Sequence, residues 1–374
     1  MDVQRRRAQR RLWPSYEYNQ VSVSTSSRRS LEVSLAALIA VGVILIFWSQ
    51  QRYPALLKKL HAGTGVKVAG AISFDALLKV TPEMPAPTRV MRTSVNWLYT
   101  NRFGTYFALP FGAAMMTLLA GMAAPKRFSS AAGNVLCGAV AGAPMGVCTN
   151  CATPVAQSLL VGGASTRLTV AAMISSPSFN PVVVAMAFVL FPLPIAMLRV
   201  AVPAVLLAAL PLLVRENGLV VRTIDASGAG KALGPRLVEF SRVYLRNLLR
   251  LTWLTLPWML LAAVVGALAA EMIPAYGTHL PVSVAGVICV AILGTLLPVP
   301  MALDVALAYV LYHAGVPVPY VAALLCTLGP VSVYSLSALG KQLDWRTSLR
   351  LGGAVALLGC VAGFVVMMNP IFSR

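Results

Sequence analysis

Apolar residues are gathered in blocks that are separated by short polar connections. The blocks cover 31–48, 105–123, 131–147, 154–162, 167–191, 195–214, 249–270, 281–297, 301–314, 319–339 and 348–368. A transmembrane helix needs about 20 apolar residues, so most of these blocks are long enough to cross a bilayer. The pattern predicts an all-α polytopic membrane protein with about seven to nine transmembrane helices.

Two blocks, 154–162 and 301–314, are too short to cross, and each follows a break in the apolar pattern. The breaks are CTNCATP, which begins at Cys148, and PVP, which ends at Pro300. At an offset of 152 residues the two short blocks coincide, and 9 of 45 positions are identical where chance gives about four. The sequence therefore predicts two copies of one unit.

Basic connections indicate how the chain crosses the membrane. Those at 124–130, 215–250 and 340–350 should be cytoplasmic, because positive residues favour that side. Each copy then has three full crossings and one re-entrant or broken-helix hairpin. Three is an odd number, so the copies are inverted, and their hairpin tips meet near the midplane. A full span over 128–147 is the alternative.

The expected organisation has six parts. They are a basic cytoplasmic arm (1–30), a first transmembrane helix (31–50), an extramembrane segment (51–104), a first repeat (105–214), a basic cytoplasmic loop (215–248) and a second repeat (249–374). A cleaved signal peptide is disfavoured, since no small-residue cleavage site follows Trp48. The segment 51–104 is expected to hold one amphipathic helix around FDALLKVTPEM. We expect a multi-pass protein of the bacterial inner membrane with a cytoplasmic N-terminus.

Composition agrees with a membrane protein and excludes several other classes. Hydrophobic residues make up 58% of the chain and charged residues 11%, whereas a soluble domain has about 25% charged residues. The net charge of +19 lies in the connections, which favours the positive-inside pattern over nucleic acid binding. Six Cys are scattered, so a disulfide framework is not expected. No GxxxxGK[ST] motif is present, and we expect no cofactor.

The first break carries the most chemistry, with Cys148 and Cys151 forming a CxxC. Pro154 is expected to open the next helix, whose positive dipole end would face the preceding Cys and Thr and favour a thiolate or a bound anion. Three interpretations stay open for the thiols: contact with a solute, redox cycling, or packing. Two Cys are an incomplete structural zinc site, so no metal is expected. Gly138, Gly142 and Gly146 are spaced for close helix packing.

Four further positions are polar within apolar blocks. Asn180 lies in SSPSFNP between two prolines that should interrupt the helix, and Ser176 lies beside it. Asp304 is an acid inside an apolar block, where it either couples a proton or cation or caps a helix. Arg199 lies close to a block end and is expected to reach the membrane interface.

The run CTNCATPVAQSLLVGGASTRLTVAAMISSPSFNP resembles a family of predicted permeases that includes the organoarsenical efflux permeases. In that family a Cys-Ser-Cys tip precedes a Pro, then a helix ending in Gly, then a helix with Ser-Pro or Thr-Pro and often Asn-Pro. The positions that match are Cys148, Pro154, Gly163, Pro177, Asn180 and Pro181. The second thiol departs from the family: Asn150 takes its place, and Cys151 follows. The resemblance does not cover residues 1–104.

We therefore expect a membrane permease, not an enzyme, that moves a small thiophilic, metalloid-like or anionic solute between the CTNC and PVP tips. The resemblance implies efflux. Alternatives are a membrane thiol-disulfide oxidoreductase and a scaffold subunit of a larger complex. Expected partners are the lipid bilayer and a small solute or ion, without nucleic acid, and with a homo-oligomer or a partner membrane subunit possible. The expected solute contacts are Cys148, Thr149, Asn150, Cys151, Thr153, Pro154, Ser176, Asn180 and Asp304.

Overall fold

The computed structural model describes residues 30–62, 77–121, 130–216, 233–276, 281–299 and 303–369. Within these ranges every regular element is a helix and no strand occurs, so the all-α prediction is confirmed. The first repeat and the region before it contain α2 (Ser30–Phe47), η1 (Trp48–Arg52), α3 (Tyr53–Ala62), α4 (Ala86–Gly121), α5 (Ala131–Gly142), η3 (Ala143–Met145), α6 (Thr149–Val161), α7 (Thr166–Ser178), α8 (Pro181–Leu190) and α9 (Leu193–Leu213). The second half contains α10 (Leu233–Tyr276), α11 (Val284–Leu296), α12 (Leu303–His313), α13 (Val318–Thr327), α14 (Val333–Gln342) and α15 (Trp345–Met368).

Four helical stretches are long and apolar enough to cross a membrane: Leu31–Leu57, Leu193–Leu213, Gly234–Leu268 and Trp345–Met368. The pair α7 and α8, bent by 41°, makes a fifth if it counts as one broken span. This number, for the described residues, is below the expected seven to nine. Several apolar blocks form helices of 10 to 13 residues, which reach about 15–20 Å and fall short of the roughly 30 Å hydrocarbon core.

The distribution of side chains is that of a membrane-embedded protein. Large apolar side chains are exposed, among them Leu212 at 86% and Trp253 at 74%. In contrast, many Ser, Thr and Asn side chains are buried in the interior. Lipid accepts the apolar surface, while polar groups inside find partners within the protein. The chain is therefore embedded in a membrane through several helices.

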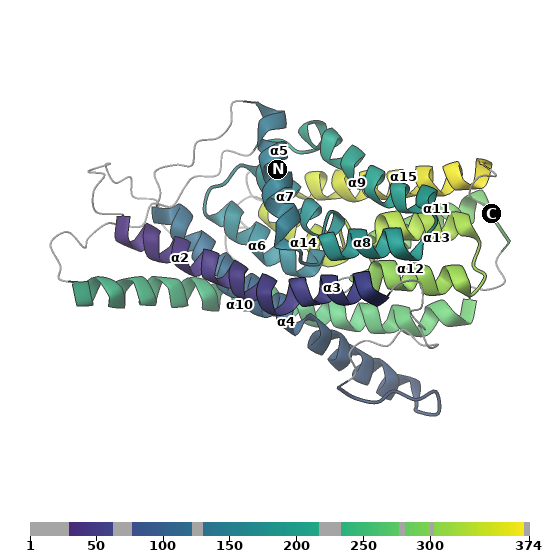
Figure 1. Cartoon of the computed structure of the whole chain (residues 1–374), viewed down its shortest axis with the longest axis horizontal. Coiled ribbons are helices and arrows are strands. Elements are labelled where there is room, and N and C mark those ends of the chain that lie inside the picture. The colour runs from purple at the N-terminus through teal and green to yellow at the C-terminus, as the bar shows by residue number, and fades with distance from the viewer. Residues whose placement is uncertain are drawn as a thin grey trace, which may run out of the picture.

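Two helices are much longer than the apolar blocks indicate. α4 has 36 residues and α10 has 44, and the two cross in contact with each other (Figure 1). α4 carries residues 86–104, which we assigned to an extramembrane segment, and α10 carries 233–248, which we assigned to a loop. Of the amphipathic helix expected around FDALLKVTPEM, residues 74–76 lie outside the described residues, and 77–84 form bends and turns because Pro82 and Pro85 interrupt a helix.

Helix starts recur along the chain at the offset found in the sequence. The N-caps of α7 and α13, Ser165 and Pro317, are 152 residues apart, as are those of α8 and α14 and those of α9 and α15. Gly163 and Gly315, also 152 apart, both have positive φ, at 85° and 83°. The two halves thus share an order of helices, and in each half a glycine turn ends the short helix, α6 in the first and α12 in the second.

Glycine spacing serves helix packing, as the sequence predicted. A Cβ added to Gly138 would overlap the carbonyl oxygen of Leu168, and one added to Gly142 would lie 2.6 Å from Cα of Ala172. Both contacts are with the backbone of α7, which cannot move aside as a flexible side chain could. Gly146 differs because it lies outside the helix with φ at 60°. Gly138 and Gly142 thus bring α5 against α7, whereas Gly146 faces Arg52 and Asn180.

Candidate functional site

The first turn of α6 lies at the centre of the site. The helix begins at Thr149 with Cys148 as N-cap, whose carbonyl accepts from the N–H groups of Cys151 and Ala152 at 3.0 and 2.8 Å. Pro154 therefore lies inside the helix and does not open it, which corrects the sequence prediction. The proline ring has no N–H to donate to the carbonyl of Asn150. The CxxC thus occupies the helix start itself and not a loop before it.

The two thiols are reduced, buried and close together. The sulfur of Cys148 is 3.3 Å from that of Cys151 and 3.5 Å from Oδ1 of Asn101, to which it donates. A Cβ on Gly104 would lie 2.5 Å from the sulfur of Cys151, so α4 approaches the thiols through a glycine. Asn101 and Gly104 belong to the segment that we assigned outside the membrane, yet they contact the motif.

Thr149 and Asn150 reach across to the second half of the chain. The hydroxyl of Thr149 donates to the carbonyl of Gly329. The amide nitrogen of Asn150 donates to the carbonyl of Val299 at 3.3 Å, and its oxygen accepts from Ser332 at 3.1 Å. Val299 belongs to the PVP break, whose last residue, Pro300, lies outside the described residues. The structure therefore brings the first break into contact with the second.

Two indole rings hold these irregular segments in place. Nε1 of Trp48 donates to the carbonyl of Pro144 at 2.6 Å, beside the first break. Nε1 of the fully buried Trp97 donates to the carbonyl of Pro298 at 3.2 Å, within the second. The carbonyls of Pro144 and Pro298 thus find donors within the protein, and the donor to Pro298 is fully buried.

Ser176, Asn180 and Thr153 satisfy nearby backbone groups. Asn180 caps α8 by accepting from the N–H of Val182 at 3.0 Å, and its amide donates to the carbonyl of Gly146 at 3.0 Å. Ser176 accepts from the N–H of Val147 at 3.2 Å, and Thr153 donates to the carbonyl of Thr149 at 2.7 Å. The predicted interruption at SSPSFNP is confirmed, with α7 ending at Ser178 and α8 starting at Pro181.

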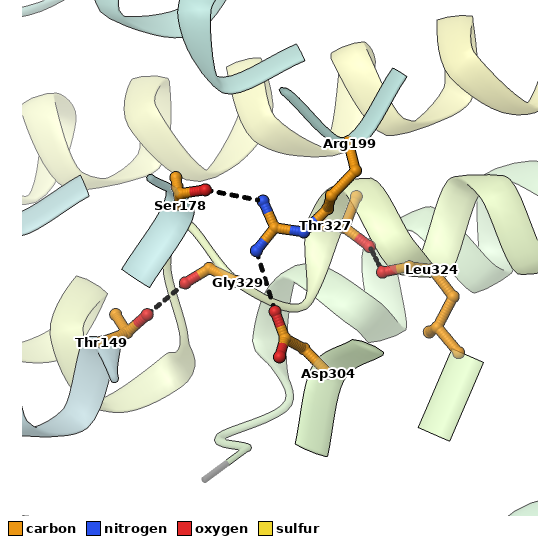
Figure 2. Close-up of polar contacts among 7 residues, drawn as sticks. All are labelled: Thr149, Ser178, Arg199, Asp304, Leu324, Thr327 and Gly329. Carbon is orange, nitrogen blue, oxygen red and sulfur yellow. Dashed lines mark hydrogen bonds and ion pairs between the residues drawn. The ribbon is translucent and has the colours of Figure 1, made fainter. Parts of the chain in front are cut away.

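A buried ion pair joins the two halves beside these contacts (Figure 2). Nη2 of Arg199, on α9, is 2.9 Å from Oδ2 of Asp304, near the start of α12. Arg199 is fully buried, so the prediction that it reaches the membrane interface is wrong. Its side chain points inward because Asp304 supplies a counter-ion there, and Nη1 is also 3.5 Å from the carbonyl of Ser178.

Gly329 connects the ion pair to the first turn of α6. A Cβ there would lie 2.6 Å from Nη2 of Arg199 and 3.3 Å from Oδ2 of Asp304. Its carbonyl accepts from Thr149, as Figure 2 shows. The glycine thus lets the charged pair lie directly against the backbone that α6 contacts.

Three polar residues of this region were not identified as site residues from the sequence. Asn101 contacts Cys148, Arg199 pairs with Asp304, and Arg52 is 7% exposed in the bulge between α2 and α3. Arg52 could have been noticed because it follows an apolar block closely. The predicted first transmembrane helix ended at residue 50, however, and so left Arg52 in the extramembrane segment. Among the described residues no three His, Cys, Asp or Glu side chains form a group that could hold a metal ion.

Comparisons with known proteins give one similarity. UPF0718 protein YraQ of Escherichia coli strain K12 is 29% identical over 243 residues, which cover 62% of this chain and 67% of that protein. The name of that protein states no solute and no activity. No family model and no solved structure matches the chain. The resemblance to organoarsenical efflux permeases therefore stays a prediction.

Proposed function

We propose that the protein is a permease, not an enzyme, that moves a small solute through the region where the first turn of α6 meets the second half of the chain. The observation that carries the proposal is the contact of Thr149 and Asn150 with Gly329, Val299 and Ser332. Irregular backbone within a membrane protein is tolerated where it is packed inside the protein or lines a water-filled cavity, and transporters place their solute sites at such breaks. The proposed solute contacts remain the nine residues predicted from the sequence: Cys148, Thr149, Asn150, Cys151, Thr153, Pro154, Ser176, Asn180 and Asp304.

The paired helix order supports two inverted repeats. Transporters of this kind place broken helices from each repeat at the midplane and alternate access by moving one unit against the other. Recurrence of helix starts at 152 residues, with Gly163 and Gly315 both at positive φ, is what such a duplication would leave. We place the protein in the bacterial inner membrane with its N-terminus in the cytoplasm.

Asp304 has a different proposed task from the thiols. Its carboxylate balances the charge of Arg199 across the two halves, so motion of one half against the other would separate or rebuild the pair. A buried carboxylate that loses a cationic partner becomes available for a proton, which is how it would couple ion movement to transport. The direction that the family resemblance implies, efflux of the solute, is also part of this proposal.

Thiol accessibility in sealed vesicles tests the site. A membrane-impermeant maleimide is applied from each side, with and without a trivalent arsenical. Labelling of Cys148 or Cys151 from one side that the arsenical blocks is expected. Cys289→Ser serves as control, because that thiol is exposed on α11 and is not among the proposed solute contacts. If Cys148→Ser and Asp304→Asn both left transport unchanged, the assignment would be refuted.

The distance of 3.3 Å between the two sulfurs keeps thiol-disulfide exchange as a second candidate. An oxidoreductase would hold part of its population as a Cys148–Cys151 disulfide during turnover. Alkylation of free thiols in intact cells, followed by reduction and a mass tag, measures that fraction. A constant, fully reduced pair would exclude the redox function, while a fraction that follows quinone supply would favour it over transport. A scaffold function would instead show as a stoichiometric membrane partner on purification.

A further inference from the structure

Arg52 is a buried cation for which the described residues supply no carboxylate counter-ion. It is 7% exposed, its Nε atom has no hydrogen-bond partner, and the described part of the chain places no carboxylate in an ion pair with it. Its guanidinium carbon lies 4.3 Å from the centre of the Phe47 ring. A cation–π contact of this kind offsets only a small part of the cost of burying a guanidinium in a membrane protein. The described residues therefore leave most of this charge unbalanced.

The position of Arg52 is built into the fold. It is the last residue of a π-helical bulge between α2 and α3, and such bulges are frequent at functional sites. The first residue of the bulge, Trp48, donates to Pro144 at 2.6 Å, which docks the bulge on the first break. A Cβ placed on Gly146 would lie 3.5 Å from Cδ and 3.6 Å from Nε of Arg52. The cation thus faces the backbone that leads into α6.

Positive potential from two sources converges at this point. Arg52 interacts electrostatically with both Cys148 and Cys151. α6 has 13 residues, and Cys148, its N-cap, makes no side-chain cap. The N–H groups and dipole of a helix start attract anions, and a guanidinium presents a planar fork that suits oxygens of an anion. The thiols of Cys148 and Cys151, at the same helix start, are weak donors.

We propose that the start of α6 and Arg52 together bind a small oxyanion, and that the permease solute carries this anionic group. The inference rests on the proposed function, since it assigns a charge to the solute of that site. It also gives the region before residue 105 a part in solute recognition, through Arg52 and, beside the thiols, Asn101. The guanidinium holds the oxyanion, the leading N–H groups of α6 orient it, and the thiols contact its far side.

Ligand-dependent protection of the purified full-length protein in lipid nanodiscs tests this proposal. The probes are sulfate and phosphate, with chloride at matched ionic strength as reference, and the readouts are the unfolding midpoint and the rate of maleimide labelling of Cys148 and Cys151. Either oxyanion is expected to raise the midpoint and slow labelling. Arg52→Gln should weaken the affinity for the oxyanion by about tenfold to a hundredfold, which is the range for loss of hydrogen bonds to a charged group. Protection should then need a correspondingly higher oxyanion concentration. Arg52→Lys should retain part of it.

Arg102→Gln is the matched control. Arg102 also lies over aromatic rings, Tyr99 and Phe103, but it donates to a carbonyl of its own helix and contacts neither thiol. Protection should be unchanged in this variant. Equal protection in Arg52→Gln, or no protection of the wild-type protein by either oxyanion, would overturn the proposal. The second outcome needs no variant, so misfolding of Arg52→Gln cannot hide it.

A neutral trivalent arsenical separates this inference from the proposed function. If the arsenical protects both thiols in the wild type and in Arg52→Gln while neither oxyanion does, the solute site stands and its anionic character is refuted. If ultraviolet absorption shows a thiolate in the wild type that Arg52→Gln removes, without any oxyanion effect, Arg52 is the counter-ion of a thiol and the proposal also fails. Protection by oxyanions that depends on Arg52 supports it.

Discussion

Breaking the Arg199–Asp304 pair on one side should be among the most destabilising substitutions available in this chain. Both groups are buried, with side-chain exposures of 0% and 6%, and their atoms approach to 2.9 Å. Removing one member of such a pair costs about 3–5 kcal/mol, because the other charge is left without a partner. Removing both charges at once costs far less.

The two single substitutions should not be equal. Asp304→Asn leaves a buried guanidinium, whose remaining hydrogen bond among the described residues is the 3.5 Å contact of Nη1 with the carbonyl of Ser178. Arg199→Met leaves a carboxyl group, which can take up a proton and become neutral. We expect about 4–5 kcal/mol for the first and about 3 kcal/mol for the second. The double variant should lose only about 1–2 kcal/mol.

Equilibrium unfolding in mixed lipid and detergent micelles, followed by tryptophan fluorescence, measures these free energies in a double-mutant cycle. The coupling energy, which is the excess of the two single losses over the loss in the double variant, should be about 5–7 kcal/mol. Arg346→Met is the control, because Arg346 is exposed in the first turn of α15 and its loss should change stability by less than about 0.5 kcal/mol. A coupling energy below about 0.5 kcal/mol would show that the pair does not stabilise the contact between the halves.

Two further predictions concern packing and capping. Gly142→Ala should destabilise the protein by about 1–3 kcal/mol, since the new Cβ would lie 2.6 Å from Cα of Ala172. Gly353→Ala is the control: its new Cβ meets no atom within 4 Å, so this variant should be neutral or stabilised by up to about 1 kcal/mol. Thermal unfolding of the two variants measures the difference. Asp344→Ala should cost about 1 kcal/mol, because Asp344 caps α15, and Asp344→Asn should keep most of that stability. Hydrogen bonds from the hydroxyl and N–H of Thr347 lower the pKa of the Asp344 carboxyl, so its contribution is present above its unfolded pKa and is lost as pH falls through the lowered value. An acid titration of stability in which wild type and Asp344→Ala differ equally at all pH values would contradict this.

Features set by neighbouring residues could be predicted from the sequence. Pro177 and Pro181 cannot continue a hydrogen-bonded helix, so the break at Asn180 follows from local chemistry. Gly138 and Gly142 lie on one helix face at a spacing that permits close approach, and they pack on the α7 backbone. Membrane character likewise follows from apolar block length. Each of these depends on residues within a few turns of one another.

Features that join distant segments needed the tertiary structure. Arg199 and Asp304 are 105 positions apart, and the apolar pattern around either one says nothing of the other. Arg52 follows an apolar block as an interfacial arginine would, and only the bulge that docks on Pro144 turns it into a buried cation beside Cys148. Pairing of charges is decided by which helices pack together, and this depends on contacts over the whole chain. Local pattern therefore determined the apolar helices and their breaks, while only the tertiary structure showed how far α4 and α10 extend, which charges are buried and what they face.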